Sequence, residues 1–172
     1  MDFENVIKTR YSVRDFENKI LSEDDINYIF EYARLAPSAK NAQPYKAYFI
    51  TDSNIIDVLK KTTKSLYNAQ NLLVITGLKN EAWINKRRGD LSICDIDVGI
   101  FATYIMLAAW NRKIGSCIVG MFDDNDLSKC IKINDNEEYK LLIILGYISN
   151  QSFPSEKYHY SRKQICDLLI RD

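Results

Sequence analysis

Hydrophobic residues near the start of the chain recur at the spacing of an amphipathic helix. Ser22 and Asp25 form a capping pattern directly before a stretch whose apolar residues fall on one helical face. These apolar residues are Ile26, Ile29, Phe30 and Ala33. Asp2 is placed to cap a shorter helix at the beginning of the chain. The N-terminal part of the sequence therefore predicts two helices.

Further along, short apolar runs alternate with helical patterns. The runs that predict strands are residues 46–51, 72–76, 116–119 and 141–148. Residues 53–66 predict a helix, and residues 123–131 predict a capped short helix. The last run, LLIILGYI, is apolar on both faces, as expected of a central strand. This alternation predicts an α+β fold.

Residues 95–110 form a helical stretch that is apolar on nearly every side. In a protein of this size such a helix belongs to the central core or is shared with a second subunit. We favour the subunit interface. Residues 150–172 begin polar and end in an amphipathic stretch with Ile165, Leu168 and Leu169, which must dock on another surface to stay ordered. A partner subunit offers such a surface.

Composition bounds the class of protein. The chain has 172 residues and a mass of 20.0 kDa, 47% of its residues are hydrophobic, and nothing reads as a long linker. Residues 1–172 are therefore expected to form a single domain. Lys plus Arg and Asp plus Glu number 23 each, so no net charge attracts nucleic acid or anionic lipid.

Neither the N-terminus nor the cysteines point to secretion or to a metal. The sequence MDFENVIKTR carries charges where a signal peptide needs an apolar run, and no apolar stretch approaches the length of a membrane span. We therefore expect a cytoplasmic protein. The four cysteines are far apart in sequence and only one histidine, His159, accompanies them. Cys94, Cys117 and Cys130 have apolar or small neighbours, so reduced, partly buried thiols fit them better than a zinc site.

The first candidate for chemistry is the segment Arg10–Arg14, with the sequence RYSVR, just past the first predicted helix. Guanidinium groups offer a fixed fork of donors that matches phosphate oxygens, and Ser12 adds another donor without bulk. This segment is therefore a candidate anion clamp. The alternative is a solvated charged turn.

The second candidate is the segment 36–44, APSAKNAQP, in which two prolines brace a polar loop that leads into a strand. Its small residues let a ligand approach the backbone. Ser38, Asn41 and Gln43 supply the donors and acceptors that a flat heterocycle or a ribityl chain requires. An ordinary connecting loop has the same composition, and that reading stays open.

Taken together, these segments resemble the nitroreductase family. The pattern R-x-S-x-R is followed about 25 residues later by P-S-x-x-N-x-Q-P, and the resemblance continues at 97–99, 115–120 and 145–147. It covers nearly the whole chain. It implies a nitroreductase-like fold, with a central mixed β-sheet flanked by helices, in an intertwined homodimer.

The resemblance also implies an FMN at the dimer interface, held by residues of both subunits. Its implied cofactor-binding residues are Arg10, Ser12, Arg14, Pro37, Ser38, Asn41, Gly120 and Arg162. Arg10 and Arg162 resemble phosphate ligands, with Lys163 as the rival of Arg162. Arg14 resembles a neighbour of the flavin pyrimidine edge. The partner's proline-braced loop supplies Pro37, Ser38 and Asn41, and the backbone at Gly120 passes near flavin N5.

The activity implied is transfer of electrons from NADH or NADPH to a small oxidised acceptor such as a nitroaromatic or a quinone, by a ping-pong mechanism. No catalytic side chain is implied, and an isolated His159 is expected to be a surface or packing residue. The segment that roofs the flavin is expected within residues 79–94. Two alternatives stay open: a flavin-binding or storage protein without significant turnover, and a cofactor-free interaction domain.

Overall fold

A four-stranded antiparallel sheet forms the centre of the computed structural model, which describes residues 2–171. The strand order is β1 (Tyr45–Ile50), β2 (Asn71–Leu78), β6 (Glu137–Tyr147) and β5 (Ile114–Val119). Pairing runs from Tyr45 opposite Gly77, and from Ile114 opposite Tyr147. A parallel bridge joins Ser12 to Ser116 at the β5 edge. Within residues 2–171 this bridge is the only parallel pairing of the sheet that was expected to be mixed.

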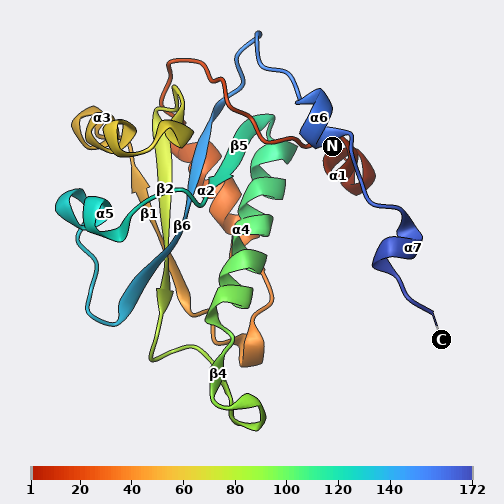
Figure 1. Ribbon diagram of the computed structural model, residues 1–172. Coiled ribbons are helices and arrows are strands. Elements are labelled where there is room, and N and C mark those ends of the chain that lie inside the picture. Colours follow the sequence, from red (N-terminus) through yellow and green to blue (C-terminus); the bar gives the residue numbers. More distant parts are fainter. Residues whose placement is uncertain (1, 172) are drawn as a thin grey trace.

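Helices surround the sheet, and a small hairpin projects from one end of it (Figure 1). The helices are α1 (Phe3–Thr9), α2 (Glu23–Ala33), α3 (Ser53–Thr62), α4 (Cys94–Asn111), α5 (Asp124–Cys130), α6 (Glu156–His159) and α7 (Ile165–Leu168). Short 3-10 turns are η1 (Ala39–Asn41), η2 (Lys64–Leu66) and η3 (Lys86–Arg88). The hairpin consists of β3 (Ile84–Asn85) and β4 (Leu91–Ser92). These elements confirm the α+β class.

Successive side chains of a strand point to opposite faces of the sheet, and both faces are covered by other elements. Leu73, Ile75, Ile143 and Leu145 pack with α2 and α4 in one core cluster. Leu72, Val74, Leu142 and Ile144 pack with α3, α5 and the N-terminal segment in the other. This explains why the run at 141–148 is apolar at every position, and it confirms that this run is a central strand.

The local signals at helix ends act as the sequence predicts. Asp2 and Ser22 accept hydrogen bonds from Asn5 N and Asp25 N, at 2.8 and 3.2 Å. The helix expected at 53–66 instead ends at Thr62. Thr63 is extended, and its hydroxyl accepts a hydrogen bond from Ser65 N, which starts the separate turn η2. Two consecutive β-branched residues favour this break.

The cysteine side chains are free thiols, as the spacing predicts. Cys94 and Cys117 are buried, Cys130 is half-buried and Cys166 is exposed. None of the helices within residues 2–171 combines the length and the apolarity needed to cross a membrane.

Glu137 is a buried carboxylate that ties three strands together. It accepts hydrogen bonds from Lys46 Nζ at 3.0 Å, Tyr48 Oη at 2.8 Å, Thr76 Oγ1 at 2.8 Å and Asn134 Nδ2 at 2.7 Å. Burial alone would raise its pKa, but the four donors outweigh burial and lower the pKa to about 2. The ionised form therefore stabilises the fold.

We expect the stability of the protein to depend on this carboxylate in acid. The folded-state pKa of Glu137 lies below its ordinary value of 4.5, so its contribution to stability is complete above pH 4.5 and is lost as the pH falls toward 2. The loss amounts to about 3 kcal/mol at most. Urea unfolding at pH 7, 4 and 3 should show a smaller acid loss in Glu137→Gln than in the wild type. Glu81→Gln, at an exposed carboxylate, is the control, and parallel acid losses in all three proteins would contradict the assignment.

Candidate functional site

The arginine segment leaves α1 and crosses the sheet next to β5. Arg10 ends α1 and donates its N–H to Val6 O. Val13 N then donates to Ser116 O at 3.0 Å, beside the bridge between Ser12 and Ser116. Val13 is fully buried, whereas Arg14 is exposed. The alternation of buried and exposed residues turns the polar side chains of this segment toward solvent.

Two glycines allow the segment to lie this close to the sheet. A Cβ atom on Gly115 would lie 2.8 Å from Val13 Cβ, and one on Gly146 would lie 2.9 Å from Phe16 Cδ1. Real Cβ atoms do not approach other atoms so closely. The segments 115–120 and 145–147 therefore each need a glycine where the arginine segment packs against them.

The C-terminal segment comes back to the same place. Tyr11 Oη donates to Ser152 O at 3.0 Å, and the ring of Tyr11 makes an edge contact with the ring of His159, 6.1 Å between centroids. A pocket of about 70 Å³ lies between the two segments. It is lined by Arg10, Tyr11, Ser12, Arg14, Ser155, Tyr158, His159 and Arg162. Lys163 does not line it.

This pocket holds three guanidinium groups and no carboxylate. Arg14 Nη1 donates to Ser12 O at 3.3 Å, and Arg162 Nη1 donates to Tyr158 O at 3.2 Å and Ser161 O at 2.6 Å. Within residues 2–171, Arg10, Arg14 and Arg162 form no salt bridge. Like charges repel in a shared pocket, so the arrangement favours a bound anion.

The small pocket adjoins a larger hollow. The hollow has a volume of about 680 Å³ and shares Ser12, Arg14, Ser155 and Tyr158 with the small pocket. That volume lies in the range of small-molecule sites. Its other walls include Tyr67 and Phe153. Tyr67 has φ 48° and ψ −135°, a strained conformation that costs a bulky residue about 1–3 kcal/mol.

The proline-braced loop is held by α4. Asp97 is buried in the first turns of α4, and its Oδ1 accepts a hydrogen bond from Ala39 N at 3.0 Å. Gln43 N donates to Ser38 Oγ at 2.9 Å. Asn41 and Gln43 have positive φ, as does Lys40 between the prolines. The loop therefore has a defined, turned conformation, and Pro37 and Asn41 are exposed at its surface.

In a single chain the loop and the arginine segment lie at opposite ends of α4. Asp97 holds the loop near the start of this helix. Trp110, 13 residues later, donates from Nε1 to Thr9 Oγ1 at 2.8 Å and packs edge-on against Tyr11. At 1.5 Å per residue the two anchors are about 20 Å apart along the helix. One chain therefore does not bring the two predicted halves of the site together.

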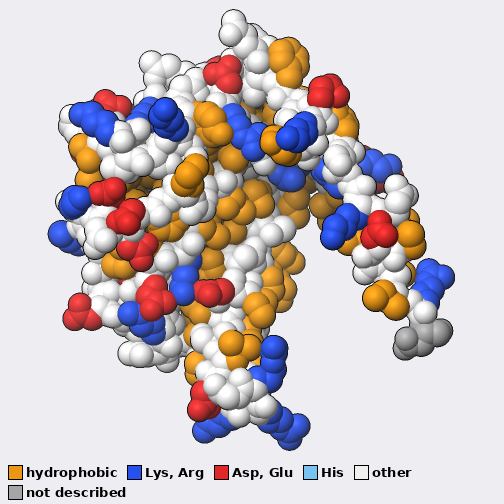
Figure 2. All heavy atoms as spheres, viewed as in Figure 1, with side chains coloured by type: hydrophobic (Ala, Val, Ile, Leu, Met, Phe, Trp, Pro, Cys, Tyr) orange, Lys and Arg blue, Asp and Glu red, His pale blue; other side chains and the backbone are white. Residues whose placement is uncertain are grey.

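The β3–β4 hairpin lies beside the proline-braced loop. Lys40 Nζ lies 5.9 Å from the centroid of the Trp83 ring, which connects the loop to the start of the hairpin. The tip of the hairpin carries Lys86, Arg87 and Arg88, all exposed. Basic side chains accordingly gather at this end of the molecule (Figure 2).

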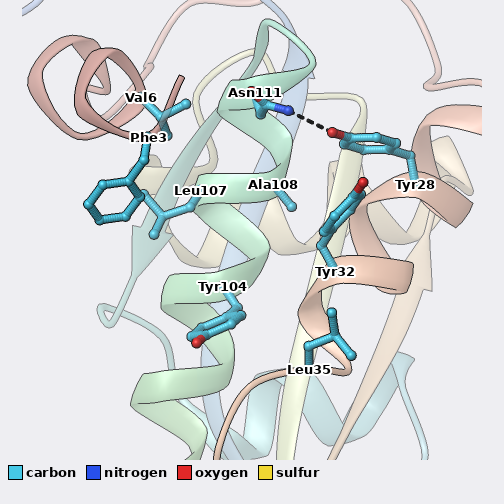
Figure 3. A pocket seen from close by; sticks show the side chains of 9 residues that line it. All are labelled: Phe3, Val6, Tyr28, Tyr32, Leu35, Tyr104, Leu107, Ala108 and Asn111. Carbon is cyan, nitrogen blue, oxygen red and sulfur yellow. Dashed lines mark hydrogen bonds between the residues drawn. The ribbon is translucent and has the colours of Figure 1, made fainter. Parts of the chain in front are cut away.

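An apolar groove of about 540 Å³ runs between α1, α2 and α4 (Figure 3). Its walls are Phe3, Val6, Tyr28, Tyr32, Leu35, Tyr104, Leu107, Ala108 and Asn111. Phe3 and Leu35 are 77% and 60% exposed, which is unusual for large apolar side chains gathered in one place. Asn111 Nδ2 donates to Tyr28 Oη at 2.6 Å and joins α4 to α2 at one end of the groove (Figure 3). The long apolar helix is therefore only partly covered by its own chain.

The sequence identified four members of the arginine pocket, Arg10, Ser12, Arg14 and Arg162, and the structure brings them together. Pro37, Ser38 and Asn41 lie at the other end of α4. Gly120 follows β5, four residues beyond Ser116, or about 13 Å along the strand. Sequence reasoning missed Ser155 and Tyr158 in the pocket and Tyr67 in the adjoining hollow, because no local pattern marks these residues.

Fold and site together define an α+β protein with a pocket of three guanidinium groups built from both ends of its chain. The family model described as "Nitroreductase family" matches residues 7–65 and 57–147, so the chain belongs to the nitroreductase family. A relative from Archaeoglobus fulgidus, provisionally named NADH dehydrogenase/NAD(P)H nitroreductase, is 28% identical over 152 residues, 83% of each chain.

Solved structures share the whole fold. A nitroreductase family protein from Clostridium difficile superposes with a TM-score of 0.88 at 24% identity, over 99% of this chain and 98% of that one. A nitroreductase-like protein from Desulfovibrio desulfuricans, solved in complex with FMN, superposes with a TM-score of 0.80 at 19% identity, over 98% and 95% of the chains. These structures confirm the nitroreductase-like fold.

The glycines offer a matched pair of substitutions. Gly115→Ala should destabilise the protein by about 1–3 kcal/mol, because the new methyl group would displace Val13 and the arginine segment. Gly120→Ala should leave stability within about 0.5 kcal/mol, because a Cβ there meets nothing within 4 Å. Chemical denaturation of both variants measures the difference. Equal stabilities would show that the segment does not depend on this contact.

Proposed function

We propose that the protein is an FMN-dependent oxidoreductase that passes electrons from NADH or NADPH to a small oxidised acceptor by a ping-pong mechanism. One observation carries the proposal: three guanidinium groups from the two ends of the chain share a pocket without a carboxylate. Membership of the nitroreductase family and the FMN complex of the Desulfovibrio desulfuricans protein support it.

The residues of the pocket fit a mononucleotide. A volume of about 70 Å³ admits a group of phosphate size but not a flavin ring, and the adjoining hollow of about 680 Å³ is large enough for the ring. Arg10 and Arg162 would hold the phosphate with charge-assisted hydrogen bonds. Ser12, which lines both spaces, would bind the phosphate or the ribityl chain. When bound, FMN supplies the two-electron chemistry that links a nicotinamide to the acceptor.

The chain's own residues would act by position and charge. Arg14 reaches into both spaces, and a fixed cation at the pyrimidine edge favours the negative charge that arises there on reduction. Gly120 is exposed after β5 and has no atom within 4 Å of the place where a Cβ would lie, so a ligand could approach its backbone closely. We assign no catalytic side chain.

The proposed active form is a homodimer with each site shared by two chains. The arginine segment and the proline-braced loop of one chain are about 20 Å apart along α4, so Pro37, Ser38 and Asn41 would serve the partner's site. A two-fold axis makes such an exchange reciprocal. The β3–β4 hairpin, which accompanies the loop, would then roof the flavin of the partner and select the acceptor.

Two exposed apolar surfaces support this assembly. One is the groove between α1, α2 and α4. The other is the C-terminal segment, which extends away from the body (Figure 1) and exposes Ile165, Leu168 and Ile170 by 76%, 71% and 87%. Removing apolar surfaces of this kind from water is favourable and would stabilise a dimer. A second copy of the chain would cover both surfaces.

The proposed activity predicts a colour change. Purified protein loaded with FMN should bleach under anaerobic conditions when NADH or NADPH is added, and the yellow colour should return when a quinone or a nitroaromatic follows. A protein that only stores flavin would stay yellow with both nicotinamides. A protein that ignores added FMN would exclude the proposal. Titration with each nicotinamide in turn also identifies the preferred donor.

Arg10→Ala should weaken FMN binding about 10- to 150-fold, because it removes a charge-assisted hydrogen bond of about 1.5–3 kcal/mol. Arg10→Lys should bind with intermediate affinity, since it keeps the charge but loses the guanidinium fork. Quenching of FMN fluorescence measures all three affinities. Lys132→Ala, at an exposed cation outside the pocket, is the control. An unchanged affinity in Arg10→Ala would refute the phosphate assignment.

Mixing two defective variants extends this test to the shared site. Asn41→Asp keeps a residue type that tolerates positive φ but replaces the amide donor with a charge. Refolding the Asn41→Asp and Arg10→Ala variants together should produce mixed dimers as about half of all dimers. Each mixed dimer has one intact and one doubly defective site, so tight FMN binding should return at about a quarter of the sites. A site within one chain would show no recovery.

A further inference from the structure

His159 stands at the wall of the arginine pocket, at the end of α6. Ser155 caps this helix by accepting a hydrogen bond from Tyr158 N, and both of these residues line the same pocket. The imidazole packs edge-on against Tyr11 and Tyr160, with centroid distances of 6.1 and 4.7 Å. This fits the packing role expected from the sequence. It also places a titratable group beside three guanidiniums.

The charged groups around His159 are mostly cations. Arg10 and Arg14 face the pocket from the N-terminal segment, and Arg162 faces it from the turn after α6. On α6 itself Glu156 and Lys157 are exposed. Tyr11, Tyr158 and Tyr160 surround the ring as neutral groups. Within residues 2–171 the imidazole of His159 makes no hydrogen bond or ion pair.

We propose that His159 is a fourth ligand of the phosphate group, and that it binds as the imidazolium; this rests on the proposed FMN site. A phosphate dianion in this pocket offsets the charge of the guanidiniums and gives an imidazolium N–H an acceptor. Phosphate binding therefore draws a proton onto His159.

The consequence is a preference for phosphorylated flavin that depends on pH. Imidazole is the side chain whose charge changes between pH 5 and 8, whereas the three guanidiniums stay charged throughout. The contribution of His159 to discrimination between FMN and riboflavin, which lacks the phosphate, should therefore increase as the pH falls from 8 to 6. Replacing His159 should cost more FMN affinity in mildly acidic solution than at pH 8.

His159→Gln tests the proposal, because glutamine keeps a polar side chain but cannot take up the proton. FMN and riboflavin affinities are measured by fluorescence quenching at pH 6 and 8. At pH 6 the variant should bind FMN about tenfold more weakly than the wild type, and at pH 8 less than about threefold more weakly. Riboflavin affinity should not change. Comparison at equal pH cancels the titration of the phosphate itself, whose second pKa is about 6.

Lys157→Gln is the matched control, since it removes an exposed positive charge two residues away on the same helix. It should change FMN affinity less than about threefold at both pH values. Equal weakening of His159→Gln at both pH values, or loss of riboflavin binding, would overturn the proposal in favour of a packing role. A wild type that binds neither flavin would instead refute the proposed function. Calorimetry in two buffers of different ionisation enthalpy should show fewer protons taken up by His159→Gln than by the wild type on binding FMN.

Discussion

The close contact between the N-terminal segment and the sheet determines where the charges of this protein lie. Val13 and Phe16 rest on Gly115 and Gly146, and any larger residue at either glycine would push the segment outward. Because that contact fixes the backbone, Arg10, Ser12 and Arg14 emerge on one side of it. The hydrogen bond from Tyr11 to Ser152 then brings the C-terminal segment, with Arg162, to the same pocket.

The buried apolar contact of the N-terminal segment with the sheet thus holds three like charges close together. Three guanidiniums without a carboxylate repel one another, and the free energy that holds them together comes from the core beneath. The thiol of Cys117 lies in that core. Burial raises its pKa, and Arg14, Ser12 and Arg10 only partly oppose this, so the thiol stays neutral under the pocket. This arrangement supports the proposal that the three cations bind an anion.

The sequence predicted the elements well because hydrophobic periodicity is local, and Asp2, Ser22 and the run 141–148 behave as expected. It could not give the strand order, which depends on pairing between distant segments. The segment Arg10–Arg14 was a candidate from its residues alone, but Arg162 entered only through family resemblance. Tyr11 and Ser152, whose contact joins the two segments, are 141 positions apart. Tyr67 was missed as a wall of the hollow, and His159 was expected only as a surface or packing residue. An isolated tyrosine or histidine carries no pattern until the fold shows its neighbours.

The distance between the two ends of α4 has a consequence for the life of the protein in solution. If each cofactor is gripped by two chains, then dilution below the dissociation constant of the dimer releases flavin and partner in one event. Occupancy would rise more steeply with protein concentration than it does at a self-contained site. A newly made chain would stay colourless until it met a second one, so that assembly itself would decide when reducing power becomes available.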